Sequence, residues 1–212
     1  SDWSSDVGSS DLMKEDATTL KDLAAQADVF VQGYRPGALA RHGLGPAHLA
    51  ELRPGILCVS LNCYGHTGPM AGRAGWEQLA QSATGMARAH SDEVGNVGSG
   101  PVLFPAAAAD YTTGYLAAFG ALAALRKQHL EGGSWHVRVS LARTAMWMMD
   151  LGSTDHRKAQ AVTEEEAAAL SDERDTPFGK MRFLRPADKL SITPSYWDLP
   201  PSPQGSANPI WR

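Results

Sequence analysis

Apolar positions in the first part of the chain fall in short runs that alternate between helical and strand spacing. Leu20 and Leu23 lie on one side of a helix expected over residues 16–27, with Asp16 as its cap. The run at residues 28–32 follows at once and predicts a short buried strand. Helical spacing therefore gives way to strand spacing with almost no connecting loop.

The same alternation repeats further on. About one helical turn is expected over residues 38–42, and Pro46 opens a helix over residues 46–52. Residues 56–62 are nearly continuous in apolar side chains, as in a strand buried on both faces. Helix, strand, helix and strand joined by short connections indicate an α/β fold with a parallel, Rossmann-like sheet flanked by helices.

Four further elements continue this pattern up to Leu151. A polar, glycine-rich and mobile loop is expected between the first two of them, over residues 91–100. The expected elements are a helix over 76–84, a long helix over 110–131, a strand over 135–141 and a helix over 142–151.

The long helix is the most apolar element, and the rest of the chain is organised around it. Tyr111, Tyr115 and Leu122 share one face, and other apolar residues surround them, so most of this helix is expected to be buried. Asp110 stands at its start. There the carboxylate would accept hydrogen bonds from free backbone N–H groups and be favoured by the helix dipole. It could be a nucleophile toward an activated acyl carbon, or an ordinary helix cap.

The chain changes character after Gly152. An acidic helix is expected over residues 163–170, and residues 172–212 are expected to form an extended, proline-rich arm. Its aromatic side chains would anchor this arm on its own body or on a partner subunit, because disordered segments are poor in such residues. We therefore expect an α/β core over residues 1–152, incomplete at its N-terminus, and a C-terminal segment over 153–212.

Composition narrows the classes of function. The 212 residues carry a net charge of −4 and no basic run, which argues against a nucleic-acid partner. Cys58 and Cys63 are too few for a disulfide framework and lack partners at metal-binding spacing, so no metal and a cytoplasmic setting are expected. No segment has the length and apolarity of a membrane span, and no signal-peptide pattern occurs.

Two loops that follow strands carry candidate chemistry. Tyr34, Arg35 and Arg41 follow the first strand, and an aromatic ring with two guanidinium groups suits a nucleotide. They could equally be surface residues around a turn. His66 follows the second strand and could be a general base or a solvated loop histidine.

Several blocks of the sequence, taken together, resemble the class III CoA-transferases. This is the CaiB/BaiF family, in the superfamily of formyl-CoA transferase and α-methylacyl-CoA racemase. Individually each block would be weak, but their order along residues 27–151 makes the resemblance specific. The blocks are residues 28–39 with 43–45, residues 59–69, residues 75–85, residues 109–118 and residues 132–141.

The resemblance implies an acyl-CoA:carboxylate CoA-transferase with Asp110 as its nucleophile. In that family the aspartate attacks an acyl-CoA, giving a mixed anhydride and free CoA thiolate, in transfer between carboxylic acids. The implied substrates are coenzyme A, as acyl-CoA, and a carboxylic acid, and the implied assembly is an interlocked homodimer. Residues implied to contact the cofactor are Gly33, Tyr34, Arg35, Ala38, Arg41 and Trp76.

Two departures from the family pattern leave alternatives open. Trp76 stands where the racemase branch has a histidine, which disfavours an acyl-CoA racemase or isomerase. Family members usually begin with a strand and a glycine-containing turn before the segment seen here, and many carry a further small domain. The chain is therefore expected to be a fragment or a shortened member. A non-catalytic half that only dimerises is the remaining alternative.

Overall fold

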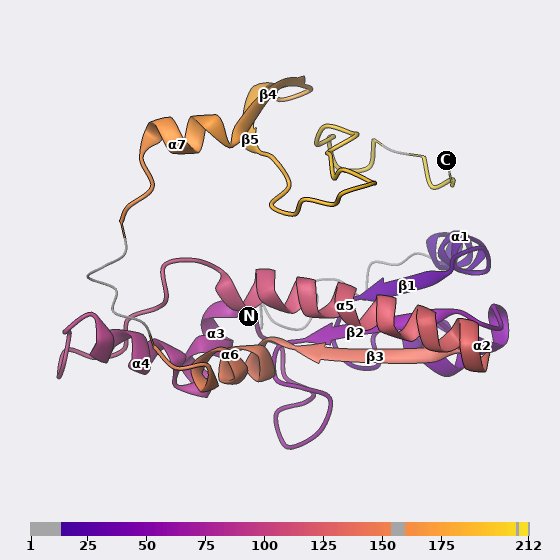
Figure 1. Cartoon of the computed structure of the whole chain (residues 1–212). Coiled ribbons are helices and arrows are strands. Elements are labelled where there is room, and N and C mark those ends of the chain that lie inside the picture. Colours follow the sequence, from indigo (N-terminus) through magenta and orange to yellow (C-terminus); the bar gives the residue numbers. More distant parts are fainter. Residues whose placement is uncertain (1–13, 154–159, 207, 212) are drawn as a thin grey trace. The chain divides into compact units, whose positions relative to one another are not determined.

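The computed structural model describes residues 14–153, 160–206 and 208–211. The chain divides into two compact units, the first ending at Thr154 and the second beginning at Asp155. The first unit is built on a three-stranded parallel sheet (Figure 1). Its strands, in spatial order, are β1 (Val29–Gln32), β2 (Leu57–Asn62) and β3 (Trp135–Ser140). The expected parallel α/β sheet flanked by helices is thereby confirmed.

The strands differ in burial according to their place in the sheet. β2 lies in the centre and is almost wholly buried, as its continuous apolar sequence predicted. In contrast, β1 lies at the edge of the described sheet, and Val31 is 67% exposed. The prediction of a buried first strand was wrong because nothing in the described unit covers the α5 face of β1 at Val31.

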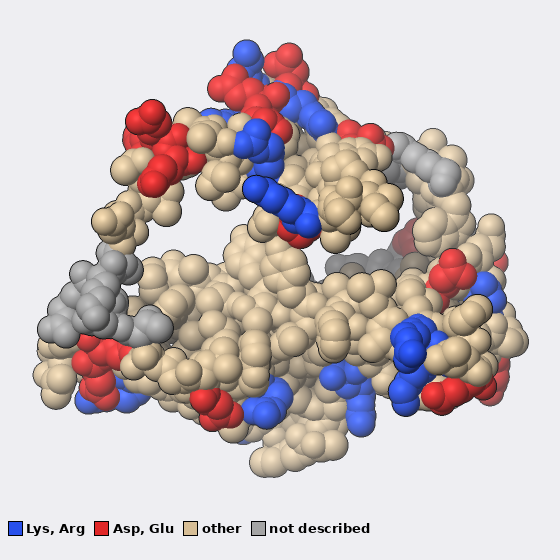
Figure 2. All heavy atoms as spheres, viewed as in Figure 1, with Lys and Arg blue, Asp and Glu red and all other residues tan. Residues whose placement is uncertain are grey.

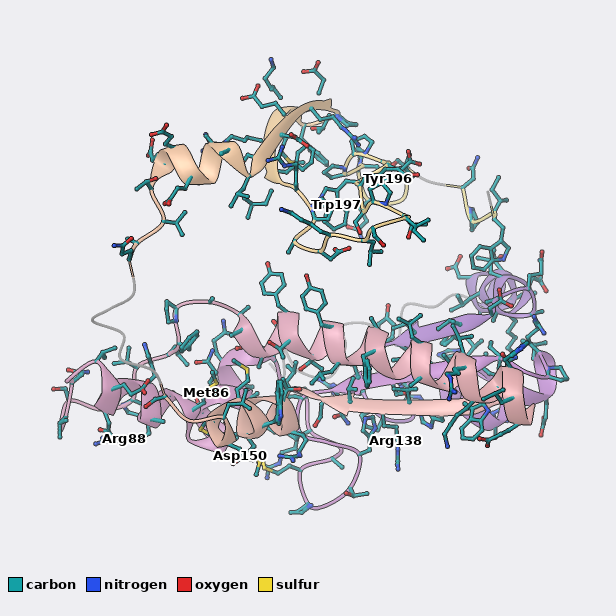
Figure 3. The ribbon with its side chains drawn as sticks, viewed as in Figure 1. Met86, Arg88, Arg138, Asp150, Tyr196 and Trp197 are labelled. Atoms are coloured by element: carbon teal, nitrogen blue, oxygen red, sulfur yellow. The ribbon has the colours of Figure 1, made fainter. Side chains whose placement is uncertain are left out.

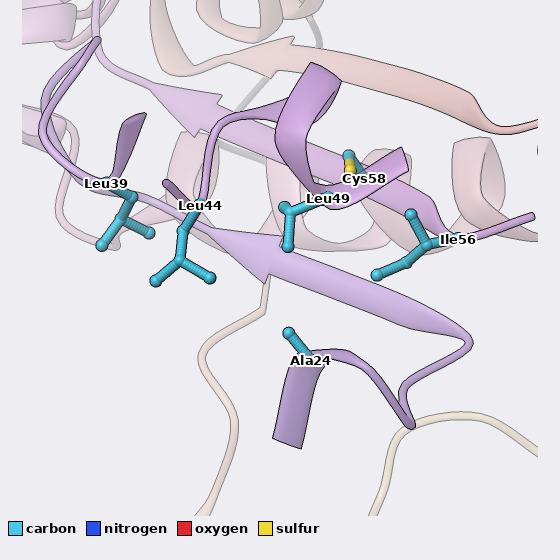
Figure 4. Packing of buried hydrophobic residues seen from close by; sticks show 6 residues of the cluster. All are labelled: Ala24, Leu39, Leu44, Leu49, Ile56 and Cys58. Atoms are coloured by element: carbon cyan, nitrogen blue, oxygen red, sulfur yellow. The ribbon is translucent and has the colours of Figure 1, made fainter. Parts of the chain in front are cut away.

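Two helices cover one face of the sheet. α1 (Lys14–Ala24) and α2 (Pro46–Leu52) contribute Ala24 and Leu49 to a cluster that also holds Ile56 and Cys58 (Figure 4). A short 3-10 helix, η1 (Ala40–His42), joins β1 to α2. Since α1 already includes Lys14, Asp16 lies inside the helix and does not cap it, contrary to the prediction.

The long helix α5 (Ala108–Glu131) covers the other face. Ala124 packs there against Leu57 and Val59 of β2. Gly120 permits a close approach to β3, because a Cβ atom at this position would lie 2.7 Å from Cγ1 of Val137. α5 therefore rests mainly small residues on the sheet, together with the partly buried Leu125.

The large side chains of α5 point outward. Tyr111, Tyr115, Phe119 and Leu122 are between 62% and 73% exposed. Much of the surface over this helix is accordingly free of charged side chains (Figure 2). The prediction that most of the helix is buried was wrong, because its buried side is formed by alanine, glycine and threonine residues that give no strong apolar signal.

Three helices pack near the carboxyl ends of the strands. They are α3 (Glu77–Thr84), α4 (Met86–Glu93) and α6 (Leu141–Asp150). α4 was not predicted and extends into the segment expected to be a mobile loop. Ser91 at its end is fully buried, and its hydroxyl donates to the carbonyl of Gly100 (2.6 Å). This hydrogen bond closes the glycine-rich loop onto the helix.

The second unit contains a helix and an antiparallel hairpin. α7 (Glu164–Ala169) begins with a capping box between Thr163 and Glu166, and those hydrogen bonds lower the pKa of Glu166. β4 (Ser171–Thr176) and β5 (Gly179–Leu184) form the hairpin. The expectation of an extended arm beginning at residue 172 was therefore wrong for this stretch.

The segment after the hairpin is held to it by hydrogen bonds. Arg174 donates to the carbonyls of Trp197 (2.7 Å) and Asp198 (3.0 Å), and the indole N–H of Trp197 donates to Leu184 (3.1 Å). Phe183 lies under the Arg174 guanidinium, 5.8 Å from its carbon. Across the described part of the chain, no helix is long and apolar enough to span a membrane.

Candidate active site

Asp110 lies in the first turn of α5, at the edge of the sheet where the strands end (Figure 1). In open parallel sheets this edge is the usual location of ligand sites. Ala107 occupies the N-cap position, and no side chain there caps the helix. Asp110 is the third residue of the first turn, so the alternative that this aspartate is an ordinary helix cap does not hold.

A different carboxylate satisfies the free N–H groups of α5. Glu77, only 3% exposed, accepts hydrogen bonds from the backbone N–H groups of Ala109 (3.1 Å) and Asp110 (2.9 Å). The two bonds use both of its carboxyl oxygens. Glu77 belongs to α3, so one side chain joins two helices and fixes the backbone that carries Asp110.

Gln81 completes this buried arrangement. It lies one turn after Glu77 and donates to it (2.9 Å), and its own carbonyl oxygen accepts from the N–H of Phe104 (2.7 Å). Gln81 is 1% exposed, and every buried side-chain polar atom in the described residues has a partner. The network holds the approach to α5 as well as its first turn.

The side chain of Asp110 remains exposed while its backbone is fixed. Partial desolvation raises the pKa of this carboxyl, and the negative charge of Glu77 raises it further. The prediction that local hydrogen bonds and the helix dipole hold the pKa of Asp110 down was wrong in direction. The reason is that the carboxyl group is partly desolvated, while Glu77 takes those hydrogen bonds and adds a like charge nearby.

Cys63 lies beside this pair at the end of β2. Its thiol is 4% exposed and donates to the carbonyl of Trp76 (3.6 Å). Burial raises the pKa of Cys63, and the charges of Asp110 and Glu77 act in the same direction. The residue is therefore a neutral thiol in the wall of the site and not a competing nucleophile.

The loop expected to contact coenzyme A follows β1 at the same edge of the sheet. Tyr34 is 49% exposed, and Arg35 and Arg41 are also exposed. Gly33 leaves the backbone open, since a Cβ there would meet only Leu61 at 3.8 Å. Ala38 is 3% exposed, so its methyl group packs in the core and only its backbone could contact a ligand.

A small cavity lies beneath this loop. It has a volume of about 50 Å³ and is lined in part by Arg35, Gly37 and Ser60. This space suits little more than one water molecule, so an adenine ring would have to lie on the surface of the loop and not inside it. Trp76, the sixth residue assigned to the cofactor, is 60% exposed at the start of α3.

Sequence reasoning missed Glu77 and Gln81 as residues of the site. Their spacing of four places both side chains on one face of a helix, next to the loop that leads to Trp76. A carboxylate and an amide on one face of a short helix were the sequence feature that could have identified these two residues. Among the described residues, no group of three or more His, Cys, Asp or Glu side chains could hold a metal ion.

The first unit is thus an α/β fold with a parallel sheet and an exposed aspartate in the first turn of α5. A sequence model described as CoA-transferase family III matches residues 10–185. The chain belongs to this family.

Curated relatives carry related names. The chain is 37% identical over 188 residues to an acyl-CoA transferase of Gibberella moniliformis, covering 87% of the chain and 31% of that protein. It is 40% identical over 114 residues to succinyl-CoA:glutarate CoA-transferase of Mus musculus, covering 54% of the chain and 25% of that protein. The chain thus spans a quarter to a third of the length of these two relatives.

Solved structures resemble the chain in fold. A CaiB/BaiF family protein from Brucella suis matches with a TM-score of 0.60 at 22% identity, covering 79% of this chain and 45% of that one. The Rv3272 protein of Mycobacterium tuberculosis matches with a TM-score of 0.58 at 26% identity, covering 66% and 38%. The resemblance of the sequence to the CaiB/BaiF family is confirmed.

Proposed function

We propose that the chain carries the nucleophile of an acyl-CoA:carboxylate CoA-transferase, and that this nucleophile is Asp110. One observation supports this most directly. The backbone of Asp110 is fixed by a buried glutamate while its carboxyl group stays exposed at the ligand edge of the sheet. A capping aspartate would spend its oxygens on the helix, whereas this one keeps them available.

The proposed chemistry begins at the thioester. An oxygen of the Asp110 carboxylate attacks the acyl carbon, a C–O bond forms, the C–S bond breaks, and CoA leaves as the thiolate. The thiolate then attacks the aspartyl carbonyl of the mixed anhydride, releasing the donor acid and leaving an aspartyl-CoA thioester. The acceptor acid repeats both steps in reverse order, so Asp110 is regenerated and no oxidant or reductant is required.

The raised pKa of Asp110 suits this role. A carboxylate whose pKa is raised holds its proton more tightly and is a stronger nucleophile in its ionised form. Glu77 contributes a negative charge that raises the energy of the free carboxylate. This repulsion is relieved when Asp110 becomes a neutral anhydride or thioester.

Coenzyme A is proposed to lie on the loop that follows β1. Tyr34 offers an exposed aromatic face, and Arg35 and Arg41 are exposed guanidinium groups that suit phosphate. Gly33 allows close approach of the backbone, Ala38 offers backbone groups only, and Trp76 would contribute an apolar surface. We further propose residues 1–152 as the unit that carries this site.

Homodimerisation is part of the proposal. The exposed apolar residues of α5 support it, because monomeric proteins rarely leave such a stripe uncovered. An acyl-CoA racemase is the weaker alternative, since an exposed tryptophan stands where that reaction would need an acid or base at position 76. A non-catalytic half would bind a partner through α5 and leave Asp110 unreacted.

Trapping with hydroxylamine separates these functions. The chain is incubated with succinyl-CoA or acetyl-CoA and then with hydroxylamine, and peptides are analysed by mass spectrometry. The transferase predicts a hydroxamate at Asp110, and Asp110→Asn should abolish it while leaving CoA binding nearly intact. Exchange of α-hydrogen for deuterium without a carboxylate acceptor would favour the racemase, and no adduct under turnover conditions would favour the non-catalytic half.

A further inference from the structure

A second concave site lies at the free edge of β3, outside the residues assigned to catalysis and to coenzyme A. It is an open groove of about 460 Å³, formed within the first unit by the loop after β2, the third turn of α5, the end of β3 and the start of α6. A volume of this size accommodates a small organic ligand.

One wall of the groove is cationic. Arg138 projects from β3 on the side of the sheet away from α5 (Figure 3). Arg143, one turn into α6, lines the same wall; its only ion pair among the described residues is a long, exposed contact with Asp150 (3.8 Å). Within the described part of the chain, Arg138 forms no ion pair at all.

His66 and Thr67 extend the polar wall. The Nε2 atom of His66 lies 3.1 Å from the carbonyl oxygen of Val139, which can only accept, so this nitrogen carries a proton and donates. The hydrogen bond fixes the loop against β3, so His66 is not simply a solvated loop histidine. Thr67 presents a hydroxyl beside it. The wall therefore offers donors for an anion and is not a carboxylate-rich surface.

The opposite wall is apolar. Leu116 of α5 and Trp147 of α6 line it, and Trp147 is 39% exposed. Thr144 also lines the groove and is 3% exposed; its hydroxyl accepts from Thr113 of α5 (2.8 Å) and donates to the carbonyl of Ser140 (3.1 Å). These bonds satisfy Thr144 internally, so the groove pairs an anion-binding side with an apolar side.

The groove opens close to the proposed nucleophile along α5. Thr113 and Leu116 follow Asp110 by three and six residues. These spacings correspond to about 5 and 9 Å along a helix axis. Thr113 lies one turn from Asp110, and Leu116 lies nearly two turns away and about 120° around the helix. A ligand in the groove would thus lie one to two turns from Asp110.

We propose that this groove binds an organic carboxylate with a short apolar chain. The carboxylate lies between Arg138 and Arg143, and the chain lies along Leu116 and Trp147. Bidentate pairing with guanidinium groups favours a planar carboxylate, and the apolar wall rewards carbon atoms that inorganic anions lack. The assignment of this ligand as the acceptor acid of the transfer reaction rests on the proposed function; the binding itself does not.

Binding of hexanoate to the 212-residue chain, followed by isothermal calorimetry, tests the proposal. Arg138→Gln and Arg143→Gln should each weaken binding at least about tenfold, since each removes a charge-assisted contact. Trp147→Ala should weaken it roughly fivefold through lost apolar contact. Arg126→Gln is the matched control, because this exposed arginine of α5 lies outside the groove and should leave binding unchanged.

The acids themselves provide the second comparison. Affinity should rise from acetate to hexanoate by about fourfold for each added methylene that is buried, and hexanamide should not bind. Equal affinity for acetate, hexanoate and inorganic phosphate would overturn the carboxylate assignment and leave a general anion patch. No binding of hexanoate, or binding that survives both arginine variants, would overturn the site. Hexanoate binding is measured without acyl-CoA, so failure of the trapping experiment leaves this result intact.

Discussion

At the scale of single residues, the site depends on how two carboxylates divide their tasks. Glu77 is buried and bonded to backbone N–H groups, while Asp110 is exposed and makes no cap. Burial without partners would be costly for the carboxyl group of Glu77, and its three hydrogen bonds offset that cost. Asp110 is then positioned by its backbone and remains free to react.

The free energy of unfolding of an Asp110 variant tests whether Asp110 caps the helix. The pKa of Asp110 is raised in the folded state, so its stabilising contribution belongs to the protonated form and is lost as the pH rises through that pKa. Asp110→Asn should therefore leave the free energy of unfolding at pH 7 unchanged or raise it, by less than about 1 kcal/mol because the side chain is exposed. A loss of about 1 kcal/mol in urea denaturation would instead indicate an N-cap.

Substituting Glu77 should change the titration of Asp110. In Glu77→Gln the like charge disappears, so the pKa of Asp110 should fall toward its ordinary value, as followed by carbon NMR of its carboxyl group. The amide can accept from only one of the two N–H groups, so stability should also drop by about 1–3 kcal/mol. Glu93→Gln, at the exposed end of α4, should do neither; an unchanged Asp110 titration in the Glu77 variant would contradict the assignment.

The sequence identified Asp110 and the loop around Tyr34 as candidates, but not the physical reason for the position of Asp110. Its place before a long apolar helix predicted a cap because a helix start is recognisable from local sequence. Glu77 lies 33 residues earlier, and nothing local indicates that it reaches the same helix end. A contact across that distance depends on packing of α3 against the start of α5.

At the scale of elements, the packing of α5 on β3 is set by one glycine. A methyl group at Gly120 would lie 2.7 Å from Cγ1 of Val137, so the helix or the valine would have to move. Gly120→Ala should lower the free energy of unfolding by about 1–2 kcal/mol, with the overpacking cost exceeding the gain in helix propensity. Thermal denaturation measures this.

Gly114 provides the matched control on the same helix. Nothing lies within 4 Å of a Cβ atom at this position, so Gly114→Ala should raise stability by about 0.5–1 kcal/mol. Equal effects of the two substitutions would show that α5 does not approach β3 as closely as described. A smaller partner, Val137→Ala, should restore part of the loss in the Gly120 variant.

Element positions could largely be predicted from sequence, whereas their exposed faces could not. β2, α2 and α6 were anticipated because apolar spacing and Pro46 mark them locally. Which face of α5 is buried was not anticipated, because small residues form its buried side and aromatic residues lie on its exposed side. The hairpin of β4 and β5 was missed because its strands are rich in charged residues, which weakens the alternating pattern.

At the scale of the whole molecule, the exposed stripe of α5 bears on assembly. Tyr111, Tyr115, Phe119 and Leu122 leave an uncharged surface over about three turns of helix. If this surface forms the proposed homodimer contact, Phe119→Lys should raise the dissociation constant at least about tenfold, because a buried charge would lack a partner. Sedimentation velocity over a concentration series measures the change.

Ile192 supplies the control for this experiment. It is 90% exposed but lies outside α5, so Ile192→Lys should leave the sedimentation behaviour as in the original chain. A chain that remains monomeric at every concentration, with or without the Phe119 substitution, would contradict the dimer. The proposed chemistry at Asp110 would then have to be completed within one copy.

The central claim concerns a covalent bond at one side chain. The most direct test is peptide mass spectrometry of the chain after incubation with succinyl-CoA and hydroxylamine, compared with Asp110→Asn treated identically. The account predicts a hydroxamate on Asp110 in the original chain and none on any residue of the variant. A hydroxamate on another carboxylate, or the same adduct yield in both proteins, would contradict it.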